Sequence, residues 1–405
     1  MKPSGYLIIA LMTLCTLGFS SCCQHNDDGK AKYIFLFIGD GMGTSSVDMT
    51  ESYLSYKAGK FGGEQLTFTG FPYYGTATNY SASQNITCSA AAGTAIATGH
   101  KTKNGSLGVD AEGQPQENIA ERLHKEGYQV GIITSVPLND ATPGAFYAHN
   151  ISRGNGFDIA SQIVTSGFEF FAGNGFKQHR NKEGKYIGDY LSENGMTVCY
   201  SLQELKEAGE DARIVLCEPY NNGVEPATYF AGAPVPEGHM TIHQYVTNAL
   251  DRFGEDPFFI MCEGGEIDWA AHANKTMPTI MSILAFDEAL RTAYDFYLKH
   301  PDETLIVVTA DHETGGACVG SGDTHLYTVD WGPLDSAYTA SGNTNTLDQK
   351  ANRKLNEKSR IGWTTSDHTA LNVPVYAIGK GAERFSGRMD NTDIKGKILA
   401  EQPCK

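Results

Sequence analysis

The chain has 405 residues, enough for one large α/β domain with insertions or for two ordinary domains. Its 40% hydrophobic residues and 45 glycines describe a globular, loop-rich protein and exclude a disordered or fibrous one. The formal net charge of −16 argues against a protein that binds a nucleic-acid backbone through a basic surface. Solvated surface acids explain part of this charge, and carboxylates that bind cations would explain another part.

The first residues have the pattern of an export signal. Lys2 precedes an apolar run that ends at Phe19, and two serines then lead into Cys22. We predict a signal peptide over residues 1–22, because the apolar run is too short to span a membrane comfortably. The small residues before Cys22 also suggest a lipoprotein site, while Phe19 is unusual there and leaves ordinary cleavage as the alternative. A polar tether follows over 23–31, and the chain is expected in the periplasm or cell envelope.

Strands and helices alternate along the rest of the chain. The strand-like runs are almost wholly apolar, which is typical of strands buried on both faces of a parallel sheet. We predict strands at 32–38, 129–134, 257–262, 304–309 and 372–378, and helices at 117–126, 241–253, 277–299 and 393–401. This pattern predicts an α/β fold, a doubly wound and mostly parallel central sheet with helices on both faces.

Two regions depart from that alternation. Residues 174–236 carry short elements and many polar residues, and residues 320–360 are rich in small polar residues with little periodicity. We interpret both as insertions into a single domain over 32–405, projecting from the sheet near the mouth of a site.

Carboxylates and imidazoles follow the predicted strands where these end. In open α/β sheets, ligands bind beyond the carboxyl ends of the strands. The residues concerned are Asp40, Glu263, Asp268, His272, Asp311, His312 and His368. Each alone could be a helix cap or a structural histidine. Together, carboxylates would repel one another unless divalent cations compensate them. A mixed Asp/His set suits zinc, and the harder oxygen ligand Glu263 suits Mg²⁺ together with a hydroxyl.

A nucleophile candidate lies in the small-residue run that follows Thr87. Ser89 stands where a helix begins, and the free N–H groups of a helix N-terminus favour a phosphoryl group. A nearby metal would lower the pKa of its hydroxyl. The alternatives are that Ser89 is only an N-cap, or that Thr87 or Cys88 is the nucleophile. Arg153 could bind two phosphate oxygens at once, although a lone arginine is more often a surface residue.

The cysteines indicate neither a zinc knuckle nor a dense disulfide framework. Beyond the N-terminal segment they are Cys88, Cys199, Cys217, Cys262, Cys318 and Cys404, without a CxxC spacing. Cys199 and Cys217 could pair after export. We expect Cys262 and Cys318 to be buried free thiols.

Six segments, in order, resemble the alkaline phosphatase family. They are Ile38–Gly43, Thr87–Val109, Ala141–Arg153, Glu263–His272, Thr309–His312 and the single residue His368. The resemblance runs from about 32 to 379 and weakens in the two insertions.

This resemblance implies three bound metal ions. One zinc would be held by Asp268, His272 and His368, and a second by Asp40, Asp311 and His312. One magnesium would share Asp40 and add Thr142 and Glu263. Ser89 would attack phosphorus to form a phosphoserine, and Arg153 would bind the non-bridging oxygens.

The implied activity is the hydrolysis of small-molecule phosphate monoesters. A homodimer is compatible with the resemblance, and membrane contact would come only through a lipid on Cys22. The competing hypotheses are a phosphodiesterase of the same superfamily and a non-catalytic metal- or phosphate-binding lipoprotein of the cell envelope. A sulfatase is excluded, because Cys88 lacks the proline and arginine that follow a sulfatase cysteine.

Two positions depart from the family pattern. Cys88 stands where relatives often have an aspartate, and Trp269 stands where they often have a basic residue. Asp140 keeps an acidic type seen near the magnesium site. We therefore expect Arg153 to lack a support and the phosphate site to lack a second cationic side chain.

Overall fold

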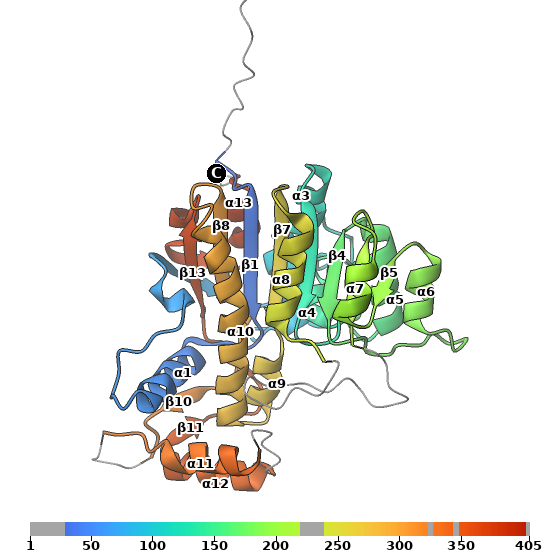
Figure 1. The fold of residues 1–405 in the computed structure, drawn as a ribbon. Coiled ribbons are helices and arrows are strands. Elements are labelled where there is room, and N and C mark those ends of the chain that lie inside the picture. The colour runs from blue at the N-terminus through green and yellow to red at the C-terminus, as the bar shows by residue number, and fades with distance from the viewer. Residues whose placement is uncertain (1–28, 219–238, 323–326, 343–347, 402–405) are drawn as a thin grey trace, which may run out of the picture.

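The computed structural model describes residues 29–218, 239–322, 327–342 and 348–401 (Figure 1). The predicted signal peptide, Cys22 and Cys404 lie outside these residues. Among the helices in these ranges, none has both the length and the apolar composition that crossing a membrane requires.

Within the described residues, a ten-stranded sheet has the spatial order β14-β2-β13-β8-β1-β7-β3-β4-β6-β5. The bounds are β1 (Tyr33–Gly39), β2 (Tyr73–Thr78), β3 (Gln129–Thr134), β4 (Phe170–Gly173), β5 (Thr197–Cys199), β6 (Ile214–Cys217), β7 (Phe258–Gly264), β8 (Thr304–Ala310), β13 (Val373–Gly379) and β14 (Gly387–Asp390). Strand β13 is antiparallel to both of its neighbours, and the other pairs are parallel. The predicted mostly parallel sheet is confirmed.

The centre of the sheet explains where a site forms. Strand β1 lies between β7 and β8, and every residue of these three strands is buried. Gly39 at the end of β1 is in register with Gly264 on one side and Ala310 on the other. Because the three strands end level, the residues that follow them meet at one edge.

Helices cover both faces of the sheet. Their bounds are α1 (Thr44–Lys57), α2 (Ser89–Thr98), α3 (Ile119–Lys125), α4 (Ala141–Gly144), α5 (Gly156–Ser166), α6 (Ile187–Glu193), α7 (Leu202–Glu207), α8 (Ile242–Phe253), α9 (Glu266–His272), α10 (Thr276–Tyr297), α11 (Gly332–Ala340), α12 (Gln349–Ser359) and α13 (Asp393–Ile398). Helices α8 and α10 pack together on one face, and α2 packs with α3, α4 and α13 on the other (Figure 1). Reciprocal capping boxes fix the first turns of α3 and α8.

The first predicted insertion does not simply project from the sheet. Its residues 187–217 form α6, β5, α7 and β6, and the two strands extend the sheet beyond β4 (Figure 1). The reason is that β6 is a fully buried apolar strand, which needs a partner on the sheet. A loop over 174–186 connects β4 to this extension.

The second predicted insertion lies beside α1 and α10, toward the carboxyl ends of the central strands (Figure 1). It contains α11, α12 and a two-stranded ribbon of β10 (Ala317–Val319) and β11 (Ile361–Trp363). A separate apolar cluster that includes Met49, Met277 and Trp331 joins it to the rest of the molecule.

The cysteines are free in the part of the chain that the structure describes. Cys262 is buried as predicted, but the prediction for Cys318 is wrong: it is exposed, because β10 belongs to the small ribbon and not to the central sheet. Cys199 is in register with Leu216, so the next residue, Cys217, points to the opposite face of the sheet. The structure therefore gives no support to a disulfide between Cys199 and Cys217.

Candidate active site

The predicted site residues come together at the carboxyl edge of the central strands. Asp40 directly follows β1, and Asp311 and His312 directly follow β8. Glu263 is the penultimate residue of β7, and α9, which carries Asp268 and His272, begins three residues after it. His368 lies in β12 (His368–Thr369), which pairs with β9 (Glu313–Thr314).

His312 stands at the centre of this cluster and is fully buried. Its Nε2 atom lies 3.2 Å from Asp40 Oδ1 and 3.3 Å from Asp311 Oδ2. Both of these carboxylate oxygens are buried without a hydrogen-bond partner. A buried, unsatisfied carboxylate oxygen is costly, and a cation bound between the three residues would remove that cost.

Thr314 determines which nitrogen of His312 carries the proton. Its hydroxyl donates to Asp268 Oδ1 at 2.5 Å, which leaves the hydroxyl oxygen to accept from His312 Nδ1 at 3.2 Å. The Nε2 atom of neutral His312 then presents its lone pair to the unpartnered carboxylate oxygens. This is the tautomer that a metal ligand requires.

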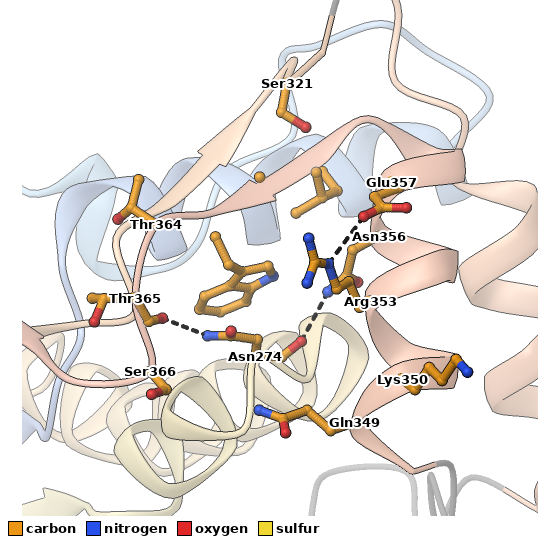
Figure 2. Close-up of a pocket in the computed structure, with 13 residues that line it drawn as sticks. Asn274, Ser321, Gln349, Lys350, Arg353, Asn356, Glu357, Thr364, Thr365 and Ser366 are labelled. Carbon is orange, nitrogen blue, oxygen red and sulfur yellow. Dashed lines mark hydrogen bonds and ion pairs between the residues drawn. The ribbon is translucent and has the colours of Figure 1, made fainter.

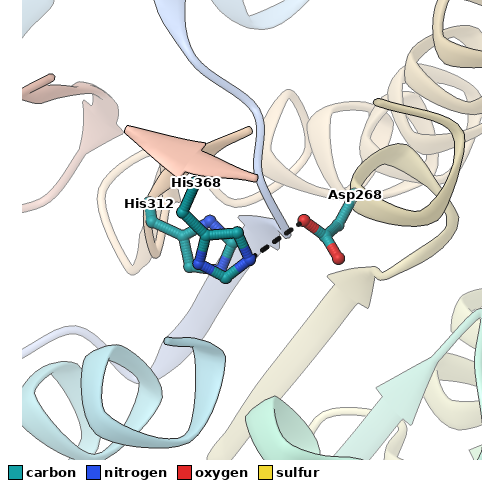
Figure 3. Close-up of side chains that lie close together, drawn as sticks. All are labelled: Asp268, His312 and His368. Atoms are coloured by element: carbon teal, nitrogen blue, oxygen red, sulfur yellow. Dashed lines mark ion pairs between the residues drawn. The ribbon is translucent and has the colours of Figure 1, made fainter. Parts of the chain in front are cut away.

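A second group surrounds Asp268, and Figure 3 shows it with His312 and His368. His368 Nε2 lies 3.6 Å from Asp268 Oδ1, and His272 Nε2 lies 3.4 Å from Asp268 Oδ2. The rings of His312 and His368 are stacked, with centroids 3.6 Å apart. Two groups of three side chains have ligand atoms that all lie within 4.8 Å of one another, close enough to bind one ion each. The first group is Asp268, His312 and His368, and the second is Asp40, Asp311 and His312.

Backbone carbonyls orient the two outer histidines. His272 Nδ1 donates to Ser366 O at 2.6 Å, and His368 Nδ1 donates to Thr87 O at 2.8 Å. Their Nε2 atoms therefore face each other at 3.2 Å. The hydrogen bond with Asp268 raises the pKa of His272 to about 9, and a bound cation would take the place of that proton.

The remaining carboxylates hold protons more tightly than usual. Burial, and then the charge of Asp140, raises the pKa of Glu263 to about 8. Burial, followed by the charge of Asp268, raises the pKa of Asp311 to about 7. Burial and the charge of Asp311 raise the pKa of Asp40 well above its usual value. Such shifts show the cost of clustered carboxylates that cations would offset.

Glu263 and Thr142 form the oxygen-rich part of the site. The Glu263 side chain is buried and accepts a hydrogen bond from the Thr134 hydroxyl. The Thr142 hydroxyl is close enough to lower the pKa of Glu263, yet it is buried without a hydrogen bond of good geometry. With Asp40, these residues offer oxygen ligands only, which suits a hard cation.

Ser89 is the first residue of α2 and is buried beside His312. Its hydroxyl oxygen lies 3.2 Å from His312 Nε2. Cys88 occupies the N-cap position instead, without a side-chain capping bond, so the interpretation of Ser89 as only an N-cap is wrong. The Thr87 hydroxyl donates to Cys88 O at 3.2 Å, and Cys88 Sγ accepts from Gly105 N at 3.1 Å. The two competing nucleophiles are thus engaged with the backbone.

Arg153 does have a support, contrary to the expectation from Cys88. Its Nη2 atom lies 2.9 Å from Oδ1 of Asp140, which is buried. A second cation is also present: Lys177 pairs with Asp140 Oδ2 and lies over the ring of Trp269. Sequence reasoning missed Lys177, because it lies in the first insertion, where no motif marked it.

A pocket of about 680 Å³ borders the site in the second insertion (Figure 2). Asn274 stands between its two walls, donating to Thr365 O at 2.8 Å and accepting through its own carbonyl from Asn356 at 2.9 Å. Ser366, which accepts from His272, belongs to the same wall as Thr365. The pocket therefore lies on the side of His272 that faces away from Asp268.

Comparisons with known proteins agree on one family. A family model described as alkaline phosphatase matches residues 31–173 and 236–402. Alkaline phosphatase 4 of Bacillus subtilis is 29% identical, over 91% of this chain and 88% of its own length. The structure is similar to a cold-active alkaline phosphatase from a Shewanella species, with a TM-score of 0.78, 26% identity and coverage of 91% of this chain and 99% of the other.

A second solved relative is the alkaline phosphatase of the Antarctic bacterium TAB5, with a TM-score of 0.72, 28% identity and coverage of 91% and 98%. The two matched parts of the family model leave out residues 174–235. Lys177 therefore lies outside the part of the chain that the family describes.

Proposed function

The chain belongs to the alkaline phosphatase family and is a metal-dependent phosphomonoesterase, and we propose that it acts through a phosphoserine on Ser89 with two zinc ions and one magnesium ion. The observation that carries the proposal is the position of the Ser89 hydroxyl, 3.2 Å from His312 Nε2, the atom that itself lies beside two unpartnered carboxylate oxygens. A serine buried against metal-ligand groups is placed for nucleophilic attack.

The donor sets support the choice of metals. Asp268, His272 and His368 would hold one zinc, and Asp40, Asp311 and His312 the other, since both sets mix nitrogen and oxygen without thiolate. Asp40, Thr142 and Glu263 would hold magnesium through oxygen. A variant of the TAB5 relative has Mg bound in its M3 site. When bound, these ions supply the positive charge that lowers the pKa of a hydroxyl and stabilises a departing ester oxygen.

The side chains of this protein perform the remaining tasks. Ser89 Oγ forms a bond to phosphorus while the bond to the alcohol breaks, and water later cleaves the phosphoserine. The first N–H groups of α2, which have no intrahelical partner, favour a phosphoryl group on Ser89. Arg153, held by Asp140, would bind the non-bridging oxygens, where negative charge accumulates.

Kinetics on a substrate panel test the proposal. We expect phosphate monoesters to be hydrolysed much faster than diesters by protein that contains zinc and magnesium in the same sample. Faster diester hydrolysis would favour the phosphodiesterase hypothesis. A protein that binds metal but turns over neither substrate would favour the non-catalytic lipoprotein.

We also propose that the chain is exported and is anchored by a lipid on Cys22. The support is the signal-like pattern of residues 1–22, and the substrates would then be small-molecule phosphate monoesters outside the cytoplasm. Fractionation of cells that make wild type or Cys22→Ala tests it: the wild type should fractionate with membranes and the variant should not. Equal distribution of the two would exclude the anchor.

A further inference from the structure

We infer that Lys177 is a positioning residue of the phosphate site, which holds Asp140 in place for Arg153 and gives the group of Asp140, Arg153 and Lys177 a net charge of +1 toward substrate. The inference rests on the proposed function and adds a residue to it from the segment that the family match leaves out. Relatives often have a basic residue at position 269, where this chain has Trp269. Lys177 supplies the second cation of the phosphate site instead.

The Asp140 carboxylate divides its two oxygens between two cations. Oδ1 accepts from Arg153 Nη2 at 2.9 Å, and Oδ2 pairs with Lys177 Nζ. Oδ1 also accepts from Ala141 N at 2.8 Å. Because Asp140 is buried and held through both oxygens, it cannot rotate without breaking an ion pair.

The backbone of Lys177 is held as firmly as its side chain. Lys177 N donates to Asn139 Oδ1 at 2.8 Å, and Asn139 Nδ2 donates to Lys177 O at 2.6 Å. Asn139 is buried and directly precedes Asp140. In addition, Gln178 Oε1 accepts from Gly156 N at 3.0 Å. Two adjacent residues thus fix Lys177 through its main chain and its charge, which distinguishes it from an unrestrained surface lysine.

The ring of Trp269 also contacts the Lys177 ammonium group. Lys177 Nζ lies 5.0 Å from the centroid of the indole ring, within the range of a cation–π contact. Trp269 lies in α9 and directly follows Asp268 in sequence, so the contact joins Lys177 to the helix that carries a proposed zinc ligand. The side chains of Lys177 and Arg153 remain 35% and 39% exposed, so both charges stay within reach of a ligand.

A count of charges shows what Lys177 adds. Asp140 and Arg153 alone form a neutral pair, which would attract a phosphate dianion weakly. With Lys177, the three groups carry a net charge of +1 beside a site that is otherwise rich in carboxylates. Lys177 should therefore matter most for binding of substrate and of inorganic phosphate, and less for the chemical step.

Variants of Lys177 test this in the metal-loaded enzyme. Lys177→Met removes the charge but keeps an aliphatic stem over Trp269, and Lys177→Arg keeps the charge. Lys185→Met is the matched control, since Lys185 lies in the same loop and pairs with the exposed Glu193. The measurements are kcat and KM for a phosphate monoester, the inhibition constant of inorganic phosphate, and Tm.

We expect Lys177→Met to raise KM and the inhibition constant by about 10-fold, with a smaller change in kcat. Lys177→Arg should restore most of the loss, and Lys185→Met should behave as wild type. In an Arg153→Ala background the effect of Lys177→Met should shrink, because the residue that Lys177 positions is then gone.

Unchanged KM and an unchanged inhibition constant of phosphate in Lys177→Met would overturn the inference. A lowered Tm of Lys177→Met, combined with no recovery of phosphate binding in Lys177→Arg, would also overturn it, because that result indicates a structural role only. These outcomes differ from failure of the proposed function, in which the wild type itself lacks phosphatase activity. In that event, calorimetric binding of inorganic phosphate to the same variants still decides: equal affinity for wild type and Lys177→Met refutes the inference.

Discussion

Thr314 illustrates how a residue without ligand chemistry can control a metal site. Its hydroxyl links Asp268 to His312 and so sets the tautomer of His312. Thr314→Val keeps the shape and removes both hydrogen bonds. Loss of such a supporting bond typically lowers metal affinity 10- to 100-fold, so we expect about that weakening. Zinc titrations check it, with Thr247→Val in α8, whose hydroxyl donates only to His243 O of its own helix, as the control. Equal zinc affinity in Thr314→Val and wild type would remove Thr314 from the site.

Arg153 carries the direct contact to phosphate in this account. A bidentate charged contact contributes roughly 1.5–3 kcal/mol, so Arg153→Ala should weaken inhibition by inorganic phosphate about 10- to 100-fold. An Arg153→Ala enzyme that binds phosphate as tightly as wild type would exclude the arginine from the site.

Cys88→Asp is the informative companion to Arg153→Ala. From sequence alone, an aspartate at position 88 should support Arg153 and tighten phosphate binding. The structure removes the reason for that expectation, because Asp140 already holds Arg153 and Cys88 accepts from Gly105 N. We therefore expect Cys88→Asp to leave the inhibition constant of phosphate unchanged. Tighter phosphate inhibition in Cys88→Asp would show that the support from Asp140 is insufficient.

The site residues that directly follow a buried strand could be predicted from the sequence. Asp40, Asp311 and His312 follow buried apolar runs directly, so the carboxyl edge of the sheet collects them. Lys177 and Thr314 could not be predicted, because their contacts depend on how a loop folds back and on a two-residue ladder. No periodicity encodes either arrangement.

At the scale of elements, one ion pair ties α3 to the segment that carries Arg153. His149 Nε2 lies 2.8 Å from Glu121 Oε1 on α3, and His149 Nδ1 donates to Gly108 O at 2.6 Å. The hydrogen bond with Glu121 raises the pKa of His149 above its usual 6.5. The folded state therefore binds the imidazolium proton more tightly than the unfolded chain does.

The pH dependence follows from that sign. Stability from the pair is fully present below about pH 6.5 and is lost as the pH rises through the raised pKa of His149. At about pH 6, His149→Gln should be less stable than wild type by about 1 kcal/mol, a value reduced by partial exposure. Melting curves with fixed metal concentrations should show the two proteins converge as the pH rises above about 6.5 and through the raised pKa of His149. A gap that stays constant over this range would contradict the assignment.

Long apolar or capped elements could be predicted, and short ones could not. The predicted strand at 129–134 coincides with β3, and the helix predicted to begin at Thr241 starts there because Thr241 and Gln244 form a capping box. Strands β5 and β6 are three and four residues long, too short for a period to show. The antiparallel direction of β13 depends on the chain path and not on its composition.

At the scale of the whole molecule, the chain has a net charge of −16, and bound cations would offset the part of it that comes from the buried carboxylates. Purified protein should hold about two zinc ions and about one magnesium ion per chain. Chelation should abolish activity and lower Tm, because the ions bind only the folded state. Metal analysis, kinetics and melting curves on one preparation check this. Full activity after exhaustive removal of metal would contradict the account.

The identity of the nucleophile is the central claim, and mapping the phosphoenzyme tests it most directly. Wild-type protein is mixed with a phosphate monoester, quenched in acid, digested and examined by mass spectrometry. The account predicts one phosphoryl group on Ser89, no phosphoenzyme in Ser89→Ala, and a turnover in that variant that is lower by several orders of magnitude. A phosphoryl group on Thr87 or Cys88, or full turnover in Ser89→Ala, would contradict it.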